Sequence, residues 1–489
     1  MPDDKQSESS DHTTRKVTPI ERVVILVIVV GALALRVGTA VTHQSLAHPD
    51  EIFQTQEPAH QLAFGYSVRT WEWREGVRSW VFPLMLAGIM RLTEKVGSGS
   101  SGYVTATAIF LSLISLSTVW FGYKWARRAS GIEAALIAAG CCAVWYELVL
   151  FAARALTEVV AAHALLPGLY LGIYGNEITE KRRMFLAGLF CGVAAALRVQ
   201  LLLAVFLGMI YFCRERWRER LRPLVMGALV PAIIFGVVDA CTWSYPFQSY
   251  YRYIWVNVIE GRSSLYGTQP WFWYISLLLT HLGPLAVLAA IGVRRSPILG
   301  WLAFIMVAAH SMISHKESRF IYPAVPLAIT LASIGIVEIA KTCGAIWKSP
   351  LRTRIVVGGS VAFVSAMSFW LSAQFVYRAE DGGGLAAFRQ LSRDPNVCGI
   401  GLHGVAWLET GGYTYLHRRV PIFPLIGEYQ AREASPGFNA LLSFGTLDRV
   451  EGNFHLQTCW GEVCLYKRPG LCKPNGLGEL NSELKLAGE

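Results

Sequence analysis

Charged residues are scarce in this chain. Asp, Glu, Lys and Arg make up only 16% of the 489 residues, whereas 53% are hydrophobic, and long apolar stretches recur between residues 20 and 376. A soluble globular protein needs a more polar surface than this composition provides, so the soluble class is excluded. The sequence instead predicts an all-α polytopic membrane protein over residues 20–376.

A cleavage site after the first apolar run is also missing. That run, residues 23–41, is longer than the core of a signal peptide, and no clear small-residue site follows it. We therefore interpret the run as an uncleaved signal anchor. The polar residues 1–19 that precede it are expected to form a disordered cytoplasmic head.

The basic residues stand in short clusters between the apolar runs. Lys and Arg outnumber Asp and Glu by 44 to 34. Such an excess can indicate nucleic-acid binding, but clusters between membrane segments are typical of topology determinants, which tend to stay in the cytoplasm. We expect no nucleic-acid partner. The predicted cytoplasmic clusters are residues 124–128, 181–183, 214–222, 294–295 and 341–354.

About eleven apolar segments are expected to cross the membrane, since a crossing needs roughly 20 mostly apolar residues. Two of them are short and are predicted to be half-depth helices that meet at the sequence LRVQ, residues 197–200. Helices broken at membrane depth are tolerated mainly where they line a cavity. The expected segments are residues 20–41, 103–123, 131–151, 158–176, 184–197, 199–212, 222–241, 272–293, 297–313, 320–341 and 354–376.

The first exterior loop, residues 42–102, is predicted to be large and partly helical. Within it, residues 80–95 are apolar enough to cross the membrane. A crossing there would place the basic cluster at residues 124–128 outside, against the tendency of such clusters to stay in the cytoplasm. We therefore expect this segment to lie along the outer interface.

An odd number of crossings places residues 377–489 outside as well. Short β-like runs such as VCGIGL and VCLYKR alternate there with Gly and Pro turns, which predicts a small exterior α/β domain. Four of the ten cysteines, Cys398, Cys459, Cys464 and Cys472, fall in this domain. In an oxidising compartment they predict one or two disulfides, with three connectivities if all four pair, and a zinc site is the less favoured alternative.

With this topology, polar side chains concentrate at the exterior face. A single Arg or His at a helix end can simply snorkel or cap the helix, but such roles require no gathering on one side. The asymmetry favours a functional site, although Glu57 and His60 are also spaced to pair along one helix. The residues concerned are His48, Asp50, Glu51, Gln54, Glu57, His60, Glu72, Arg78, Arg154, Glu158, Arg198 and Gln200, with the segments 263–274 and 314–323.

Carboxylates beside a lipid surface, facing Lys and Arg, suit a reaction with an anionic leaving group. One carboxylate accepts a proton from an acceptor hydroxyl, while the cations bind a phosphate and stabilise the charge that it gains. In the stretch HKESR, Lys316 and Arg319 can approach phosphate oxygens from two directions. Tryptophans such as Trp71 and Trp271 can stack on a sugar or an isoprenoid chain, although interfacial tryptophan is also an ordinary anchor. The pattern predicts glycosyl transfer from a lipid phosphate.

Four motifs in order, HPDEIFQTQEPAH, TWEW followed by RS, YGTQPWFWY and HKESRFIYP, span residues 48–323. Together they resemble the lipid-phosphomannose-dependent mannosyltransferases of the GT-C class, glycosyltransferase family 22. The HPDE form most resembles the branch that contains the third GPI mannosyltransferase. The resemblance implies dolichyl- or polyprenyl-phosphate mannose as donor, a glycolipid or glycan as acceptor, inversion at the anomeric carbon, no metal cofactor, and an active site facing the periplasm or the lumen of the endoplasmic reticulum.

The resemblance also implies roles for individual residues. Asp50 would be the general base, with Glu51 beside it and Glu72 as a supporting carboxylate. Arg198, His315, Lys316 and Arg319 would surround the donor phosphate. Substrate contacts are expected from His48, Gln54, Glu57, His60, Trp71, Arg78, Arg154, Glu158, Tyr266, Gln269 and Trp271.

Two departures leave the acceptor open, because relatives commonly have His at the positions of Gln269 and Phe272. A GT-C transferase of another sugar is therefore an alternative. A transporter or flippase for a lipid-linked sugar is the alternative from another class, since broken helices and intramembrane charges also suit transporters. The charges here cluster at one interface and the sequence has no evident repeated half, which favours the enzyme.

Overall fold

The long apolar runs form helices in the structure, which is a computed structural model of the chain. It describes residues 18–42, 45–97, 99–175, 178–347, 350–378, 382–425, 435–447, 452–473 and 478–486. Most of the head expected to be disordered, residues 1–17, lies outside these ranges. The helices of the membrane part are α1 (Pro19–Thr42), α2 (Glu57–Phe64), α3 (Trp71–Arg74), α4 (Val81–Glu94), α5 (Gly99–Ser130), α6 (Ile132–Val144), α7 (Tyr146–Leu150), α8 (Thr157–Ile173), α9 (Glu180–Leu197), α10 (Leu202–Cys213), α11 (Trp217–Thr242), α12 (Gln248–Ile254), α13 (Trp273–Leu282), α14 (Pro284–Gly292), α15 (Pro297–Ser311), α16 (Val325–Trp347) and α17 (Pro350–Arg378).

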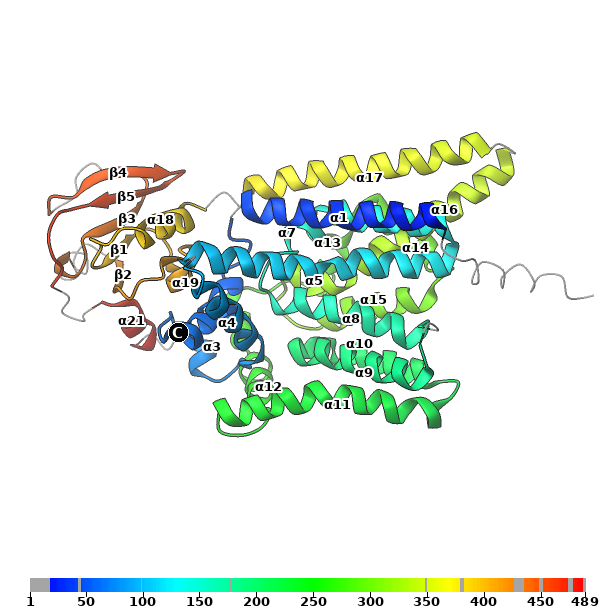
Figure 1. The fold of residues 1–489 in the computed structure, drawn as a ribbon, viewed down its shortest axis with the longest axis horizontal. Coiled ribbons are helices and arrows are strands. Elements are labelled where there is room, and N and C mark those ends of the chain that lie inside the picture. The colour runs from blue at the N-terminus through cyan, green and yellow to red at the C-terminus, as the bar shows by residue number, and fades with distance from the viewer. Residues whose placement is uncertain are drawn as a thin grey trace, which may run out of the picture.

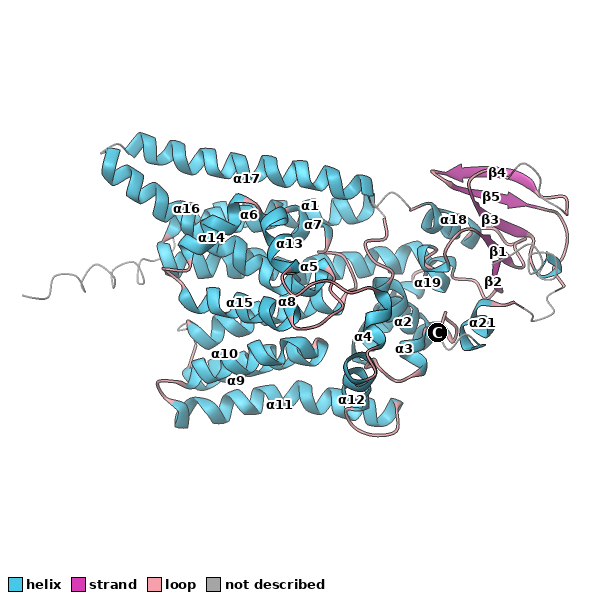
Figure 2. Ribbon diagram, turned by 180° about the vertical axis from the view of Figure 1, so that it is seen from behind, coloured by secondary structure: helices cyan, strands magenta, loops and turns pink. Residues whose placement is uncertain are grey.

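The longest helices run along one common direction in the body of the molecule (Figure 1). Within the described ranges, four helical segments are long and apolar enough to cross a membrane: α1, α5, α11 and residues 318–345, which end in α16. The shorter apolar helices α6, α8, α10 and α15 pack against them (Figure 2). This apolar, mostly helical body is that of a membrane protein.

Two helix breaks interrupt the body. At the predicted LRVQ break, α9 ends at Leu197, Arg198 is extended, and α10 starts at Leu202. A second break corrects our expectation of one span over residues 272–293, because α13 and α14 meet at an angle of 100°. Gly283 between them has φ +50, and Pro284 has no N–H to continue the helix, so the chain turns there.

Small residues let neighbouring helices approach closely. A Cβ on Gly188 of α9 would lie 1.9 Å from the carbonyl oxygen of Leu224 of α11, and a Cβ on Gly227 would lie 1.9 Å from that of Phe185. Backbone contact of this kind stabilises helix pairs in lipid, where burial of apolar surface supplies little driving force. It fixes α11 against the α9–α10 pair that carries Arg198.

The first loop is partly helical, as predicted. After α1 it forms a short π-helix, η2 (Glu51–Gln56), which continues into α2, followed by α3 and α4. Figures 1 and 2 show these elements at one end of the helical body, between it and the C-terminal sheet. Helix α4 forms most of the segment 80–95, which we expect at the outer interface, and buries Phe82, Leu86 and Met90.

The chain after α17 forms a mixed sheet with short helices. The strands are β1 (Ile400–His403), β2 (Ile422–Leu425), β3 (Ala440–Phe444), β4 (His455–Trp460) and β5 (Val463–Lys467), in the order β2-β1-β3-β5-β4. β1 is parallel to β2 and β3, and β5 is antiparallel to β3 and β4. The helices are α18 (Gly383–Ser392), α19 (Gly412–Leu416) and α21 (Leu480–Leu486). We call this unit the C-terminal domain.

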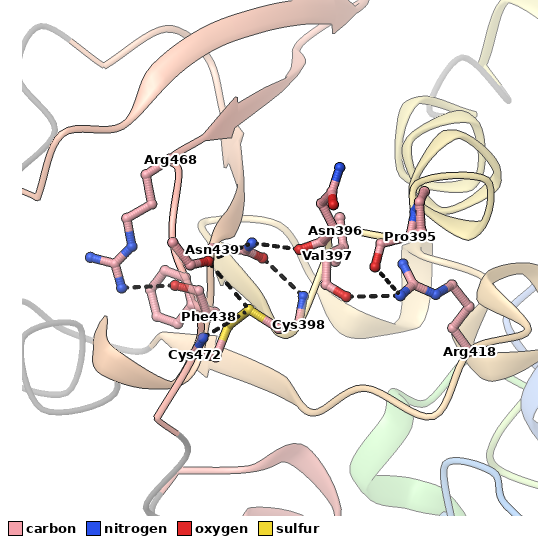
Figure 3. Close-up of a disulfide and its surroundings, with 10 residues drawn as sticks. Pro395, Asn396, Val397, Cys398, Arg418, Phe438, Asn439, Arg468 and Cys472 are labelled. Atoms are coloured by element: carbon pink, nitrogen blue, oxygen red, sulfur yellow. Dashed lines mark hydrogen bonds between the residues drawn. A yellow bond between two sulfur atoms is a disulfide. The ribbon is translucent and has the colours of Figure 1, made fainter.

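Two disulfides close this domain, which confirms the prediction from its four cysteines. They join Cys398 to Cys472 and Cys459 to Cys464. Figure 3 shows the first of them beside Asn439, whose Oδ1 accepts the Cys398 N–H at 3.0 Å and whose Nδ2 donates to the Asn396 carbonyl at 2.8 Å. The bond ties the chain before β1 to the chain after β5.

We predict unequal contributions from the two disulfides. Cys398–Cys472 links residues 74 apart and Cys459–Cys464 residues 5 apart. Loop closure in the unfolded chain then stabilises the domain by about 4 and about 2 kcal/mol, respectively. Thermal unfolding should therefore show a larger loss for C398S/C472S than for C459S/C464S. Equal losses would contradict the loop-length argument.

Candidate active site

Asp50 stands at the entry to the first-loop helices. The carbonyl of Pro49 accepts hydrogen bonds from the N–H groups of Ile52 and Phe53, which starts the helical turn around Asp50. The Asp50 carboxylate makes no capping bond to this helix. Its side chain is 23% exposed, so it remains open to a substrate on one side.

Arg319 links Asp50 to two other carboxylates. Its Nη2 donates to Asp50 Oδ2 at 2.5 Å, its Nη1 to Glu158 Oε1 at 2.6 Å, and its Nε to Glu317 Oε2 at 2.6 Å. Arg319 is 4% exposed. We call these four residues the Arg319 cluster. It joins the first loop to α8 and to the HKESR motif, which are distant in sequence.

Glu317 is a functional candidate that we did not predict. Besides Arg319, it contacts His315 Nε2 at 2.9 Å and His48 Nε2 at 3.0 Å. Burial acts to raise the pKa of Glu317, but hydrogen bonds from the two histidines and the charge of Arg319 outweigh it and lower the pKa. The same contact raises the pKa of His315. Glu317 therefore stays ionised and orients His48 beside Asp50.

Lys316 points away from this cluster. The backbone at Glu317 is extended, and successive side chains of an extended chain point to opposite sides. Lys316 Nζ donates instead to the carbonyl oxygens of Gln269, at 3.0 Å, and Ile313. It lines an open groove of about 520 Å³ between residues 268–271 and 311–316. The structure thus brings Lys316 and Gln269 together, outside the Arg319 cluster.

The predicted aromatic residues differ in their placement. Tyr266 lies against His315, with ring centroids 6.3 Å apart. Trp271 lines the Lys316 groove and is 68% exposed. Trp71 is buried, and the guanidinium carbon of Arg262 lies 4.2 Å from its ring centroid. Of these three predicted aromatic residues, Tyr266 and Trp271 therefore lie next to HKESR, and Trp71 does not.

A cavity of about 70 Å³ lies between the first loop and the α9–α10 break. Among the described residues, Arg78 Nε, Arg198 Nε and Ser79 Oγ line it, are buried and have no hydrogen-bond partner. Buried donors are rarely left unsatisfied without a reason. Here the three donors face one space. Glu158 lies next to it, with its Oε2 3.5 Å from Arg198 Nη1. We call this space the catalytic cavity.

Gln54 lines the catalytic cavity and contacts Glu72 behind it. Gln54 Nε2 donates to Glu72 Oε1 at 2.9 Å, and Arg78 Nη2 lies 3.9 Å from the same oxygen. Burial raises the pKa of Glu72, and the nearby charge of Asp50 acts in the same direction. Gln200 and Tyr253 also line the cavity, and Gln200 Nε2 donates to the Tyr253 hydroxyl. Tyr253 carries no motif, so the sequence did not reveal it.

Glu51 turns away from Asp50, as expected for adjacent residues on a helix. Its Oε1 accepts a hydrogen bond from the Ala47 N–H at 3.0 Å and lies 3.2 Å from Arg154 Nη1. Arg154 also donates to the carbonyl and hydroxyl oxygens of Ser45. Glu51 and Arg154 therefore hold the chain that leads into Asp50.

Glu57 and His60 face the C-terminal domain. Glu57 accepts hydrogen bonds from the Thr414 N–H, at 2.5 Å, the Thr414 hydroxyl, at 2.7 Å, and the Val68 N–H, at 2.5 Å. His60 Nε2 lies 3.1 Å from His417 Nδ1. Both side chains are 0% exposed, so neither offers a surface to a substrate in this structure. They attach α2, and thereby Asp50, to the C-terminal domain.

We predict a pH-dependent stability from Glu57. Burial raises its pKa from 4.5 to about 7, so between these values the folded protein holds a proton that the unfolded chain releases. Stability from this group is complete below pH 4.5 and falls by about 3 kcal/mol as pH rises through 7. In E57Q this fall should vanish, and thermal unfolding from pH 5 to 8 would show it. Burial lowers the pKa of His60 to about 4, but His60 is common to both proteins and cancels in the comparison. Parallel pH profiles would contradict the prediction.

The carboxylate of Asp50 and the nearby arginines suit a reaction that removes a proton and forms an anion. Asp50 is a partly exposed carboxylate in a fixed position, and the guanidinium groups of Arg78 and Arg198 lie around the adjacent cavity. A hydroxyl next to Asp50 can lose its proton while an anion forms at the cations.

A family model described as the Alg9-like mannosyltransferase family matches residues 27–398. GPI mannosyltransferase 3 of Yarrowia lipolytica is 30% identical to this chain over 423 residues, which cover 84% of this chain and 78% of that protein. GPI mannosyltransferase 3 of Trypanosoma brucei brucei is 26% identical over 442 residues, covering 79% and 76%, respectively.

The fold is similar to the crystal structure of ArnT from Cupriavidus metallidurans bound to undecaprenyl phosphate. The TM-score is 0.62, and the match covers 93% of this chain and 99% of that chain. The sequences are 14% identical, so this likeness concerns the fold alone.

Proposed function

The chain belongs to the Alg9-like mannosyltransferase family and is a membrane glycosyltransferase of the GT-C type, and from this premise we propose that it moves mannose from dolichyl- or polyprenyl-phosphate mannose to a glycolipid acceptor at the exterior membrane face. The observation that supports this best is the position of Asp50. Its carboxylate is oriented by Arg319, is partly open, and belongs to the loop that walls the catalytic cavity.

The proposed step is a single in-line displacement. Asp50 takes the proton of the acceptor hydroxyl, and the oxygen forms a bond to the anomeric carbon of mannose. The bond between that carbon and the phosphate oxygen breaks, and the phosphate leaves with the electron pair. Arg78 and Arg198, whose Nε atoms are free of partners within the described chain, stabilise the charge that develops. The anomeric configuration inverts.

Lys316 and the groove beside it suit the lipid side of the donor. The groove combines one ammonium group with Trp271 and the 86% exposed Met312. A phosphate attached to an isoprenoid chain needs both a cation and apolar surface. The bound lipid in the ArnT structure, undecaprenyl phosphate, belongs to this chemical class, which supports the proposal.

The proposed topology has about eleven crossings, with the N-terminus in the cytoplasm and the C-terminal domain outside. It rests on the basic clusters between the apolar runs. The two disulfides of the C-terminal domain also favour an oxidising exterior compartment.

A GPI precursor is the first acceptor to test, because both curated relatives carry the name GPI mannosyltransferase 3. Purified protein in nanodiscs would receive radiolabelled dolichyl-phosphate mannose and a synthetic GPI glycolipid. We expect a labelled, longer glycolipid that α-mannosidase shortens again. Movement of the donor across a vesicle membrane without a new glycosidic bond would support a transporter and refute the proposal.

We also propose that transfer needs no divalent metal, since Arg78, Arg198 and Lys316 supply the cationic charge for the phosphate. The rate should therefore be unchanged after dialysis against EDTA and on subsequent addition of Mg²⁺ or Mn²⁺. Loss of transfer in EDTA, with recovery on addition of one metal, would disprove this part.

A further inference from the structure

Another cavity, of about 340 Å³, is lined by residues that flank the segment 77–79 of the catalytic cavity. Three tryptophans line it: Trp73 and Trp80 from the first loop and Trp243 just after α11. The ring centroids of Trp73 and Trp80 are 4.4 Å apart, and Trp243 lies 6.5 Å from Trp73 and 6.1 Å from Trp80. We call this cavity the tryptophan pocket.

Its tryptophans differ from membrane anchors. Anchoring rings lie at the surface of the protein, as do those of Trp301, 62% exposed, and Trp217, 58% exposed. Trp73 is only 6% exposed, Trp80 and Trp243 are half-buried, and the three rings group around one space. This grouping favours a ligand inside the pocket over contact with the bilayer.

The pocket also carries hydrogen-bonding groups. The Ser67 hydroxyl donates to Gln61 Oε1 at 3.2 Å, and both residues line the pocket together with the exposed Arg69. The Nε1 of Trp73 is buried and, within the described chain, has no hydrogen-bond partner. Aromatic faces beside a few polar groups suit a sugar, because its C–H face packs on a ring while its hydroxyls form hydrogen bonds. Arg69 is the single charged residue among the described lining residues, which fits a neutral sugar better than a lipid phosphate.

The tryptophan pocket and the catalytic cavity share one segment of chain. Val77, Arg78 and Ser79 line the catalytic cavity, whereas Trp73 and Trp80 line the tryptophan pocket. Trp243 Nε1 donates to the Arg78 carbonyl at 3.1 Å, so a side chain of the tryptophan pocket holds the segment that lines the catalytic cavity. Because the neighbouring residues Ser79 and Trp80 line the two spaces, both lie within the reach of a ligand of several sugar units.

We propose that the tryptophan pocket binds a saccharide unit of the acceptor glycan, at least one sugar away from the hydroxyl that receives mannose. This inference rests on the proposed function, because it names part of the substrate of that reaction. Trp243 and Arg69 are then acceptor-binding residues, and Trp73 forms the floor of the subsite.

Acceptors of two lengths test the proposal. Octyl α-mannoside has one sugar and cannot span both spaces, whereas an octyl α-mannotrioside can. In W243A the trioside loses one aromatic contact, so we expect its KM to rise about tenfold. The KM for the monosaccharide and the KM for the donor should stay unchanged. R69A should show a smaller rise for the trioside. W243F keeps a ring and should recover most of the affinity, and W301A and R182A, at exposed residues away from both cavities, serve as matched controls.

Equal KM changes for both acceptors would mean that W243A acts through the position of Arg78, and would overturn the proposal. An unchanged KM with poorer retention in nanodiscs would also overturn it and assign the ring to the bilayer. Saturation-transfer NMR with soluble mannotriose and donor-free protein tests the pocket apart from the reaction. Signals in wild type that weaken in W243A support the subsite even if the protein transfers no mannose, whereas signals that W243A leaves unchanged refute it.

Discussion

Replacing Asp50 with asparagine is expected to lower kcat for mannosyl transfer by a factor of about 10²–10⁴. Asparagine preserves the size of the side chain, and its oxygen can still accept the hydrogen bond that Arg319 Nη2 donates. It cannot take the proton of the acceptor hydroxyl. The KM for the donor should change little, because the donor phosphate is bound by other residues. Initial rates with labelled donor measure both quantities.

Asp394 offers a matched control for the same chemical change. Its carboxylate pairs with Lys467 in the C-terminal domain, so D394N removes a charge from an ion pair without touching the candidate site. We expect transfer by D394N to proceed at the wild-type rate. Wild-type turnover by D50N, at equal protein level and donor binding, would remove Asp50 from the role of base.

The helical body could be predicted because a bilayer demands long apolar segments. The break at residues 197–200 was visible in the sequence, since Arg198 and Gln200 interrupt two short apolar runs. The bend between α13 and α14 was hidden inside one apolar run. Its signal was the pair Gly283-Pro284, where a positive φ and a missing N–H stop the helix.

The meeting of Asp50 with Arg319 could be predicted from the expected topology, because it places both motifs on the same side of the membrane. The function of Arg319 within this group could not. We expected its charge to bind phosphate, but in the structure three carboxylates share it. The neighbour Glu317 belongs to the same motif, yet only the extended backbone reveals that it faces Arg319 while Lys316 faces the groove.

The contacts of Glu57 and His60 with the C-terminal domain could not be predicted from the sequence. We expected both residues to contact substrate, and their spacing along one helix also allowed them to pair with each other. Glu57 instead binds a backbone N–H and a hydroxyl of Thr414, 357 positions away, and His60 contacts His417. A backbone donor is present at almost every position, so no residue type marks it in the sequence. The domain attachment therefore needed the three-dimensional structure.

Arg319 should be the position least tolerant of replacement after Asp50. Its guanidinium is buried, and each of its nitrogens serves a different carboxylate: Asp50, Glu158 or Glu317. Removing one partner of a buried ion pair destabilises a protein by about 3–5 kcal/mol. R319A should therefore lower the thermal stability and also lower kcat at least a hundredfold, because Asp50 loses its orientation. R319K keeps the charge, but an ammonium group cannot reproduce the planar fork, so we expect a partial recovery of stability and little recovery of kcat.

The pair of Arg127 and Glu21 separates the two effects. Arg127 Nε lies 2.6 Å from the buried Glu21, at the end of α1 and α5 remote from the first loop (Figure 1). R127A should therefore lower thermal stability while the remaining folded protein keeps its wild-type kcat. If R319A lowered kcat no more than R127A at equal folded fraction, Arg319 would be a structural residue only. Both variants lose stability, so a fall in kcat that occurs only in the Arg319 variants cannot come from lost stability. It would show that the contacts of Arg319 with the three carboxylates orient Asp50.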